Sequence, residues 1–145
     1  MLRGRHTATV DVKGRLKIPA EFKAAFDEMG YDYFVTSLDG QSAWVYPMPE
    51  WEKIEAKLKD VPSMNPAREK FVQLTNFWGQ EATLDAQGRI LIPSQLRESA
   101  ALAGEVAVMG NSGRLDVWNL SKITQHLAGN GITREEKAQL GDMGI

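Results

Sequence analysis

An eleven-residue segment occurs twice in this chain of 145 residues, as TVDVKGRLKIP at 9–19 and as TLDAQGRILIP at 83–93. The two copies share an Asp, a Gly-Arg pair and an Ile-Pro pair at the same positions. A shift of 74 residues also aligns Gly30 with Gly104 and Trp44 with Trp118 without a gap. Repeats this short cannot usually bury an apolar face alone, so the two copies are expected to pack on each other.

Each repeat has the residue pattern of a strand, a turn, a second strand, a short helix and a hairpin. In the second strand, Leu16 and Ile18 alternate with Arg15 and Lys17, which predicts one buried face and one basic face. Pro19 suits the first turn of the helix that follows. The expected elements of the first repeat are strand 6–12, turn 13–14, helix 20–30 and a hairpin of 31–38 with 43–47.

Residues 48–78, between the repeats, predict two helices on either side of the break VPSMNP. Both helices carry apolar residues at helical spacing, which we interpret as core or as a clamp to a neighbouring subunit rather than as a ligand site. A short helix is expected after Ser121. The Gly-rich residues 129–145 are expected to form a flexible C-terminal tail.

The composition excludes several classes of site. The chain has no cysteine, which rules out a disulfide framework, a zinc knuckle and a thiol nucleophile. No stretch approaches the roughly 20 apolar residues of a membrane helix, and the N-terminus lacks the apolar region of a secretory signal. These features predict a soluble, intracellular protein.

No catalytic motif is recognisable, because a Walker loop, an H-E-x-x-H pair and a G-x-S-x-G elbow are all missing from the sequence. His6 and His126 have no carboxylate at motif spacing. The segment MGNSGR at 109–114 could form a phosphate nest or a hairpin turn, and the apolar strands on either side favour the turn. We therefore expect no catalytic residue, metal, cofactor or small-molecule substrate.

The net charge of −2 argues at first against a nucleic-acid partner, but the charge is unevenly distributed. Residues 1–23 hold six Lys and Arg against two acidic residues, a local balance of +4. The matching residues 75–97 hold two of each, a balance of zero. Basic side chains can merely solubilise a strand, but a cluster of this density also favours attraction to phosphates.

The motif Asp-x-x-Gly-Arg has a physical use in a tight turn. The Asp can accept hydrogen bonds from backbone N–H groups two or more residues further on, and the Gly permits a positive φ. The Arg returns beside the Asp and can either pair with it or extend toward a phosphate or a guanine edge. On chemistry alone, Asp11 with Arg15 and Asp85 with Arg89 are either ion pairs that lock two turns or parts of a binding site.

The whole pattern is more specific than the motif. DVKGRLKIP and DAQGRILIP resemble the swapped-hairpin domains of the AbrB/SpoVT superfamily. Two copies in one chain, with MLRG at the start, WVYPMPEWEKIEAKL in the middle and GRILIPSQLRESAAL late, resemble the MraZ family over about residues 1–128. The resemblance implies an α+β, mainly β fold with two tandem swapped-hairpin domains, short helices and a pseudo-two-fold. The expected parts are a first domain at 5–49, a helical connector at 50–78, a second domain at 79–122 and the tail at 129–145.

The resemblance also implies a function. Members of the family are DNA-binding transcriptional regulators that repress their own division and cell-wall gene cluster. They bind tandem promoter repeats of double-stranded DNA as ring-shaped homo-oligomers in the cytoplasm, on the nucleoid and without a membrane partner. DNA contact in the family is attributed to the N-terminal copy, chiefly its Arg, which here is Arg15, and Arg3 also matches. With the other cations of the first repeat, the expected DNA-binding residues are Arg3, Arg5, Lys13, Arg15 and Lys17.

The second repeat is expected to serve as a scaffold, because Gln87 replaces Lys13 and Leu91 replaces Lys17. Both repeats keep the residues expected to lock the turn, which are Asp11, Gly14 and Arg15 in the first and Asp85, Gly88 and Arg89 in the second. The alternative interpretation is a non-catalytic structural or protein-interaction module without DNA binding, which the apolar middle helices would suit.

Overall fold

The computed structural model describes residues 2–145, which contain eight strands and six helices. The first repeat forms β1 (Arg5–Val10), β2 (Arg15–Lys17), α1 (Ala20–Asp27), β3 (Asp32–Thr36) and β4 (Ala43–Pro47). The connector forms α2 (Met48–Lys59) and α3 (Pro66–Trp78). The second repeat forms β5 (Gln80–Thr83), β6 (Arg89–Leu91), α4 (Ser94–Ala100), β7 (Gly104–Asn111) and β8 (Arg114–Asn119), and α5 (Leu120–Gly129) and α6 (Arg134–Asp142) follow it.

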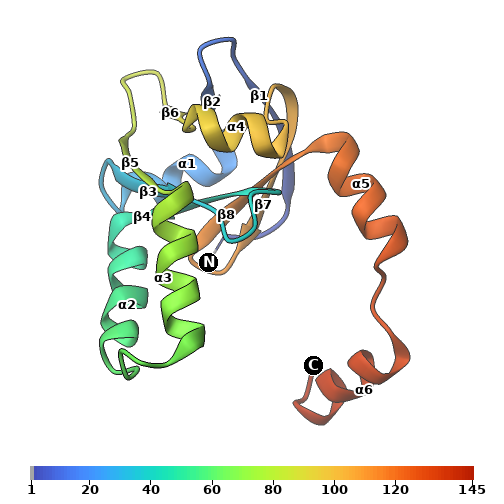
Figure 1. The fold of residues 1–145 in the computed structure, drawn as a ribbon. Coiled ribbons are helices and arrows are strands. Elements are labelled where there is room, and N and C mark those ends of the chain that lie inside the picture. The colour runs from blue at the N-terminus through green and yellow to red at the C-terminus, as the bar shows by residue number, and fades with distance from the viewer. Residues whose placement is uncertain (1) are drawn as a thin grey trace.

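Strands of the two repeats share one antiparallel sheet, in the order β5-β3-β4-β8-β7-β1-β2-β6 (Figure 1). The first strand of each repeat pairs with the hairpin of the other, β1 with β7 and β5 with β3. The two ends of the sheet, β5 and β6, are consecutive in the chain, so the sheet is nearly closed. This arrangement confirms the mainly β, swapped-hairpin fold that the sequence predicts.

A pseudo-two-fold axis passes through the centre of the β2–β6 pairing. Leu16 lies opposite Ile90, and these two residues are 74 positions apart and fully buried. The equivalent residues Ile18 and Ile92 each donate a backbone N–H to the other repeat's turn, at 3.0 and 2.9 Å. The two repeats are therefore joined at this point by matched hydrogen bonds and by a shared apolar contact.

The 74-residue spacing does not continue into the hairpins. The equivalent residues Ala8 and Ala82 pair with Val106 and Tyr33. Position 33 therefore corresponds to position 106, a spacing of 73 residues. One residue is lost at the end of the helix, because α4 has seven residues where α1 has eight.

A second residue is lost in the hairpin turn. Trp44 faces Asp116 at the centre of the β4–β8 pairing, a spacing of 72 residues. The ungapped alignment of Gly30 with Gly104 and of Trp44 with Trp118 is therefore wrong. The alignment fails because the second repeat has one residue fewer at the end of the helix and one fewer in the hairpin turn. Loops tolerate such a change and strands do not.

Helices α1 and α4 pack on the inner side of the sheet through Phe22 and Phe26 and through Leu96 and Ala100, all of them buried. The helical hairpin of α2 and α3 covers β3 and β4, as Figure 1 shows. Trp51 lies between the rings of Phe34 and Tyr46, at centroid distances of 4.7 and 5.1 Å. Trp51 is buried by these contacts, whereas Ile54 and Leu58 of the same stripe are half-buried.

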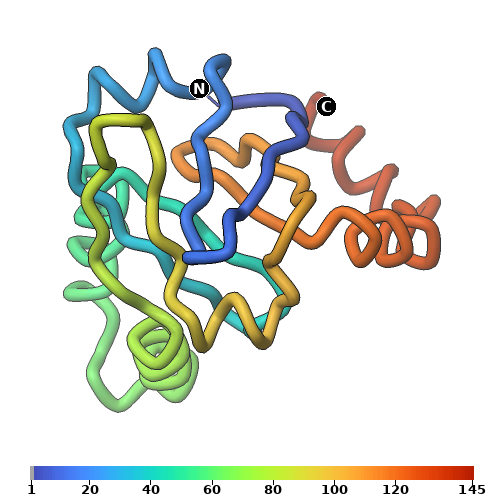
Figure 2. The backbone as a smooth tube through the Cα atoms, turned by 90° about the horizontal axis from the view of Figure 1, so that it is seen from above, coloured from blue at the N-terminus to red at the C-terminus, as the bar shows by residue number. Residues whose placement is uncertain are grey.

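The C-terminal residues extend away from the sheet. Helix α6 begins at a capping box of Thr133 and Glu136 and stands apart from the strands in Figure 1, and Figure 2 shows α5 and α6 together on one side of the molecule. All its side chains are exposed except that of Leu140, which is half-buried. The segment therefore contains a helix within the tail that the sequence predicts to be flexible. Within residues 2–145, no helix is long and apolar enough to cross a membrane.

The pairing of Leu16 with Ile90 predicts a coupled loss of stability on truncation. We expect Leu16→Ala and Ile90→Ala each to lower the free energy of unfolding by about 2–5 kcal/mol, because each leaves a cavity in the core. The double variant should lose less than the sum, because both changes open the same space. Urea unfolding of the four proteins measures the coupling, and strict additivity would contradict a shared contact at the axis.

Candidate nucleic-acid interface

Two turns of the same design link β1 to β2 and β5 to β6. In the first turn, Asp11 accepts hydrogen bonds from the backbone N–H groups of Lys13 and Arg15, both at 2.9 Å. Gly14 follows with a φ of +87°, which favours glycine. The second turn repeats these bonds between Asp85 and the N–H groups of its residues 87 and 89, at 2.9 and 2.8 Å. Each loop is thus fixed by its own Asp.

The two arginines that follow these turns are held differently. Arg89 donates from Nε to Oδ2 of Asp85 at 3.0 Å, and its Nη1 lies 3.6 Å from Oδ2 of Asp11. The Nε of Arg15 lies 3.5 Å from Oδ2 of Asp11. This nitrogen is buried and has no hydrogen-bond partner among the described residues. The guanidinium of Arg89 is therefore engaged by both turns, whereas that of Arg15 is held by one longer ion pair.

Both turn carboxyl groups have a lowered pKa. The pKa of Asp11 is lowered chiefly by the backbone N–H of Arg15, against a partial desolvation that raises it, and further by Lys13 and by the charges of Arg15 and Arg89. The pKa of Asp85 is lowered by the same kind of bonds, first of all by the backbone N–H of Arg89. Each Asp is therefore stabilised as the carboxylate that accepts these bonds.

Strands β2 and β6 end the sheet as an antiparallel pair, and β2 also pairs with β1 on its other side. We call this pair and its outward face the β2–β6 ribbon. Arg15 lies opposite Leu91, and Lys17 lies opposite Arg89. These four side chains alternate with the buried axis pair and reach the surface to different extents. Three cations and one leucine from both repeats thus lie on one small face, with the two turns at the same end of the molecule (Figure 1).

Lys13 extends the basic surface at the tip of the first turn, where it and Val12 are exposed. Arg3 and Arg5 lie elsewhere, because β1 runs from the turn to the β7–β8 hairpin, where Arg5 pairs with Met109. A strand of six residues separates its ends by about 17 Å. Of the five expected DNA-binding residues, the structure brings Lys13, Arg15 and Lys17 together and places the other two at the far end of β1.

The hairpin interpretation of MGNSGR is confirmed, because Asn111 pairs with Arg114 across the β7–β8 turn. Arg114 is engaged by Asp116 at 2.7 Å and lies over the ring of Trp44, 4.0 Å from its centroid. The side-chain donors of Asn111 and Arg114 therefore make contacts within the fold.

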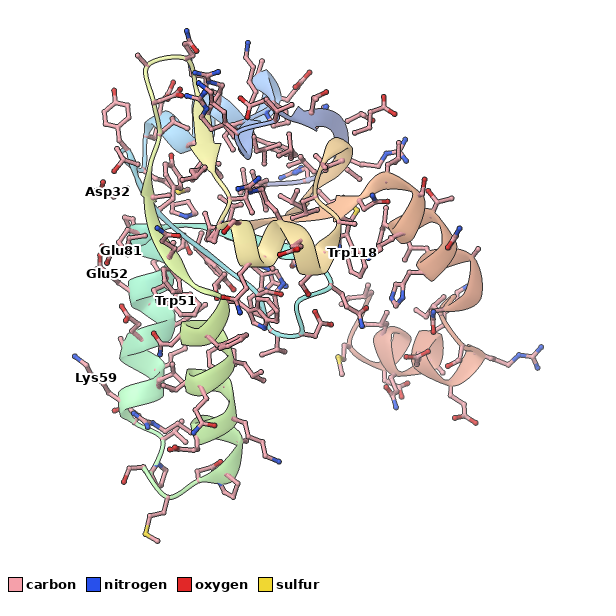
Figure 3. All side chains as sticks on the ribbon, turned by 45° about the horizontal axis from the view of Figure 1, so that its top comes forward. Asp32, Trp51, Glu52, Lys59, Glu81 and Trp118 are labelled. Atoms are coloured by element: carbon pink, nitrogen blue, oxygen red, sulfur yellow. The ribbon has the colours of Figure 1, made fainter. Side chains whose placement is uncertain are left out.

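Acidic side chains gather at another surface, beside α2. A hollow there is lined by Asp32, Glu52, Glu55 and Glu81, three of which are labelled in Figure 3. Separation of the acidic hollow from the β2–β6 ribbon accounts for a basic surface on a chain whose net charge is −2.

The swap brings one cation to the interface that sequence reasoning did not place there. Arg97, on α4 of the second repeat, lies against Gly14 in the first turn. Its equivalent in the first repeat, Lys23, lies beside Gly88 in the second turn. A count of the charges within each repeat cannot reveal that each of these cations lies beside the turn of the other repeat. The signal that could have found it is the predicted swapped pairing, which brings each helix close to the other repeat's turn.

The lowered pKa values predict that acid weakens the two turns. Their contribution to stability is complete above the unfolded-state Asp pKa of about 3.9 and is lost as the pH falls through the lower folded-state values. Between about pH 5 and pH 2, the wild type should therefore lose more stability than the double variant Asp11→Asn/Asp85→Asn. Urea midpoints across this range measure the difference, with Asp142→Asn on α6 as the control. Equal losses in wild type and double variant would show that the turn carboxylates contribute nothing to it.

Comparison with known proteins identifies relatives along the whole chain. The family model described as "MraZ protein, putative antitoxin-like" matches residues 1–74 and 79–140. A protein of Acidobacterium capsulatum is 47% identical over 146 residues, which cover 100% of both chains. Proteins of Koribacter versatilis and of a Thermoanaerobacter species are 44% and 35% identical, again over 100% of both chains. Each of these three proteins is named "Transcriptional regulator MraZ".

Proposed function

The chain belongs to the MraZ family, and we propose that it is a non-enzymatic transcriptional regulator that binds double-stranded DNA through the β2–β6 ribbon and the first turn. The observation that carries the proposal is how loosely the side chain of Arg15 is held by the protein. Its side chain is 31% exposed on the same strand face as Lys17, and its one ion pair among the described residues is the long contact between its buried Nε and Asp11. An arginine held in this way can turn its donors toward a phosphate or a guanine edge without breaking an internal hydrogen bond.

The shape of the surface suits DNA. A two-stranded antiparallel ribbon fits the major groove, and several DNA-binding proteins use strands in this way. The hydrogen bonds that Asp11 accepts fix the first turn, so little conformational entropy would be lost when its side chains contact DNA. Lys13 and Lys17 add charge that attracts phosphates regardless of base sequence.

Arg89 has a different role in the proposal. It stabilises the interface from within, because it pairs with both turn aspartates and leaves fewer donors for DNA. The second repeat also has Gln87 and Leu91 where the first has lysines. The first repeat would therefore read DNA, and the second would hold the reading surface in place.

The small size of this surface supports an oligomeric regulator. Three or four cations in each protomer make a weak site, and several sites on one assembly gain affinity through effective concentration when the DNA carries several repeats. We propose that the chain forms a ring, binds tandem repeats in the promoter of its own division and cell-wall gene cluster, represses it, and is found with the nucleoid. Arg3 and Arg5, at the far end of β1, would contact a neighbouring stretch of the same DNA.

A protein-interaction module is the second candidate. It is favoured by an apolar surface on α3, where Leu74 and Phe77 are 39% and 61% exposed. Lys70 and Gln73 complete the lining of this surface. Contacts between protomers of a ring would use the same kind of surface, so the apolar surface alone does not distinguish this candidate, a module without DNA binding, from the regulator.

Because Arg15 and Arg89 differ in their ion pairs, their alanine variants are expected to lose different properties. Arg15→Ala should abolish specific binding to the promoter repeats and leave folding and assembly unchanged. The loss of one bidentate contact costs about 1–3 kcal/mol in each protomer, and the assembly multiplies that loss. Arg89→Ala should instead lower the melting temperature or the oligomer mass, because it removes the ion pairs of Arg89 with Asp11 and Asp85. Mobility shifts, light scattering and thermal unfolding of both variants test this division.

Salt dependence provides the control for the DNA hypothesis. Each phosphate contact should add about 0.9 to the slope of log affinity against log salt concentration. Binding that does not depend on salt, or a folded oligomer that binds no promoter DNA, would contradict the proposed function. The division between the repeats would be wrong if Arg89→Ala removed DNA binding and spared both stability and assembly.

A further inference from the structure

We propose that Arg97, a residue of the second repeat, contacts a DNA phosphate as part of the first repeat's reading turn. The inference rests on the proposed function. It changes the assignment of residues within that function, because sequence position places Arg97 in the repeat expected to be a scaffold. The swapped pairing of the strands makes this exchange possible.

Arg97 is fixed against the first turn. Its Nε donates a hydrogen bond to the backbone oxygen of Ile92 at 2.9 Å. Its guanidinium lies on Gly14 so closely that a Cβ at that glycine would overlap Cζ, Nε and Nη1. The backbone of the turn is also joined to the second repeat at this point, because Ile92 donates its N–H to the oxygen of Gly14 at 2.9 Å. One face of the guanidinium is therefore covered by the loop that carries Lys13.

The terminal donors of Arg97 have no hydrogen-bond partner among the described residues. No ion pair of the described residues includes Arg97, and its only recorded side-chain hydrogen bond is the one from Nε. The residue is half-buried and lines a surface hollow together with Glu98 and Leu102, so part of its side chain is exposed. An arginine anchored through Nε with free terminal donors suits a planar, bidentate contact to a phosphate.

Lys23 shows that this arrangement is specific to one side of the pseudo-two-fold. It occupies the equivalent position on α1, 74 residues earlier, but its nearest side-chain atoms lie 3.6–3.9 Å from a Cβ placed at Gly88. No hydrogen bond of its side chain is recorded among the described residues. The turn beside it carries Gln87 and the engaged Arg89. Lys23 is therefore a matched control, a cation at the same place in the other half.

The first experiment compares Arg97→Gln with Lys23→Gln in the full chain, using DNA that carries the promoter repeats over a series of KCl concentrations. Arg97→Gln should weaken binding roughly ten- to hundredfold, for promoter and unrelated DNA alike, because a phosphate contact carries no base information. The salt slope should fall by about 0.9 for each engaged protomer. Arg97→Lys should keep the slope, and Lys23→Gln should leave both quantities unchanged.

A second measurement avoids the risk that Arg97→Gln fails to fold. Phenylglyoxal modifies accessible guanidinium groups, and mass spectrometry of the wild type gives the extent of modification at each arginine. Promoter DNA should protect Arg97 and leave Arg134, on the separate helix α6, as reactive as before. Light scattering before each assay confirms that the oligomer mass is unchanged.

The possible failures are distinguishable. If the wild type binds no DNA, the proposed function fails and this inference fails with it. If the wild type binds and Arg15→Ala abolishes binding, but Arg97→Gln keeps the wild-type slope or DNA leaves Arg97 unprotected, then only the assignment of Arg97 is overturned. Equal losses in Arg97→Gln and Lys23→Gln would indicate a general effect of net charge and would also overturn it.

Discussion

The backbone pairing of β2 with β6 determines most of what this molecule can do. Each of the two strands has only three residues, and at their centre Leu16 and Ile90 meet in the fully buried core. Because side chains of a strand alternate between faces, burial of this pair forces the flanking residues outward. Those flanking residues are Arg15, Lys17, Arg89 and Leu91. The contact that joins the repeats therefore also creates the surface proposed to bind DNA, and a one-residue slip would bury its cations.

The symmetry of this pairing is broken by charge. Asp11 lies close to an arginine from each repeat, whereas Asp85 pairs only with Arg89 among the recorded ion pairs. A carboxylate shared between two guanidinium groups holds each of them less firmly than a dedicated partner does. Arg15, which lies between Lys13 and Lys17 in the sequence, makes the weaker contact. Two turns of the same design thus give one arginine with a close ion pair and one with a longer ion pair, and this difference supports unequal roles for the two repeats.

Much of the fold was predictable, because alternation and helical spacing are local. The strand of Leu16 and Ile18, the helix after Pro19 and both helices of the connector lie where the pattern predicts them. Features that depend on how the strands of the two repeats cross in space could not be predicted from residue spacing in the sequence. The hairpins slip to spacings of 73 and 72 because loops shorten freely. Arg97 reaches the first turn, and Arg5 lies far from it, because strand direction and swapping decide proximity rather than sequence distance.

A weak reading surface and a self-associating chain are physically linked in the proposed regulator. Each protomer offers few cations, and the acidic hollow beside α2 limits how much DNA one copy can approach favourably. In the proposed ring, affinity for a promoter would then come from the number of copies on one assembly. The chain has apolar residues left over for such contacts, including Phe77 on α3 and Leu127 at the end of α5. Because binding of a ring depends on many weak sites, the loss of one cation per protomer is felt at every site at once. Small differences between two nearly identical turns can therefore decide whether the whole assembly binds DNA.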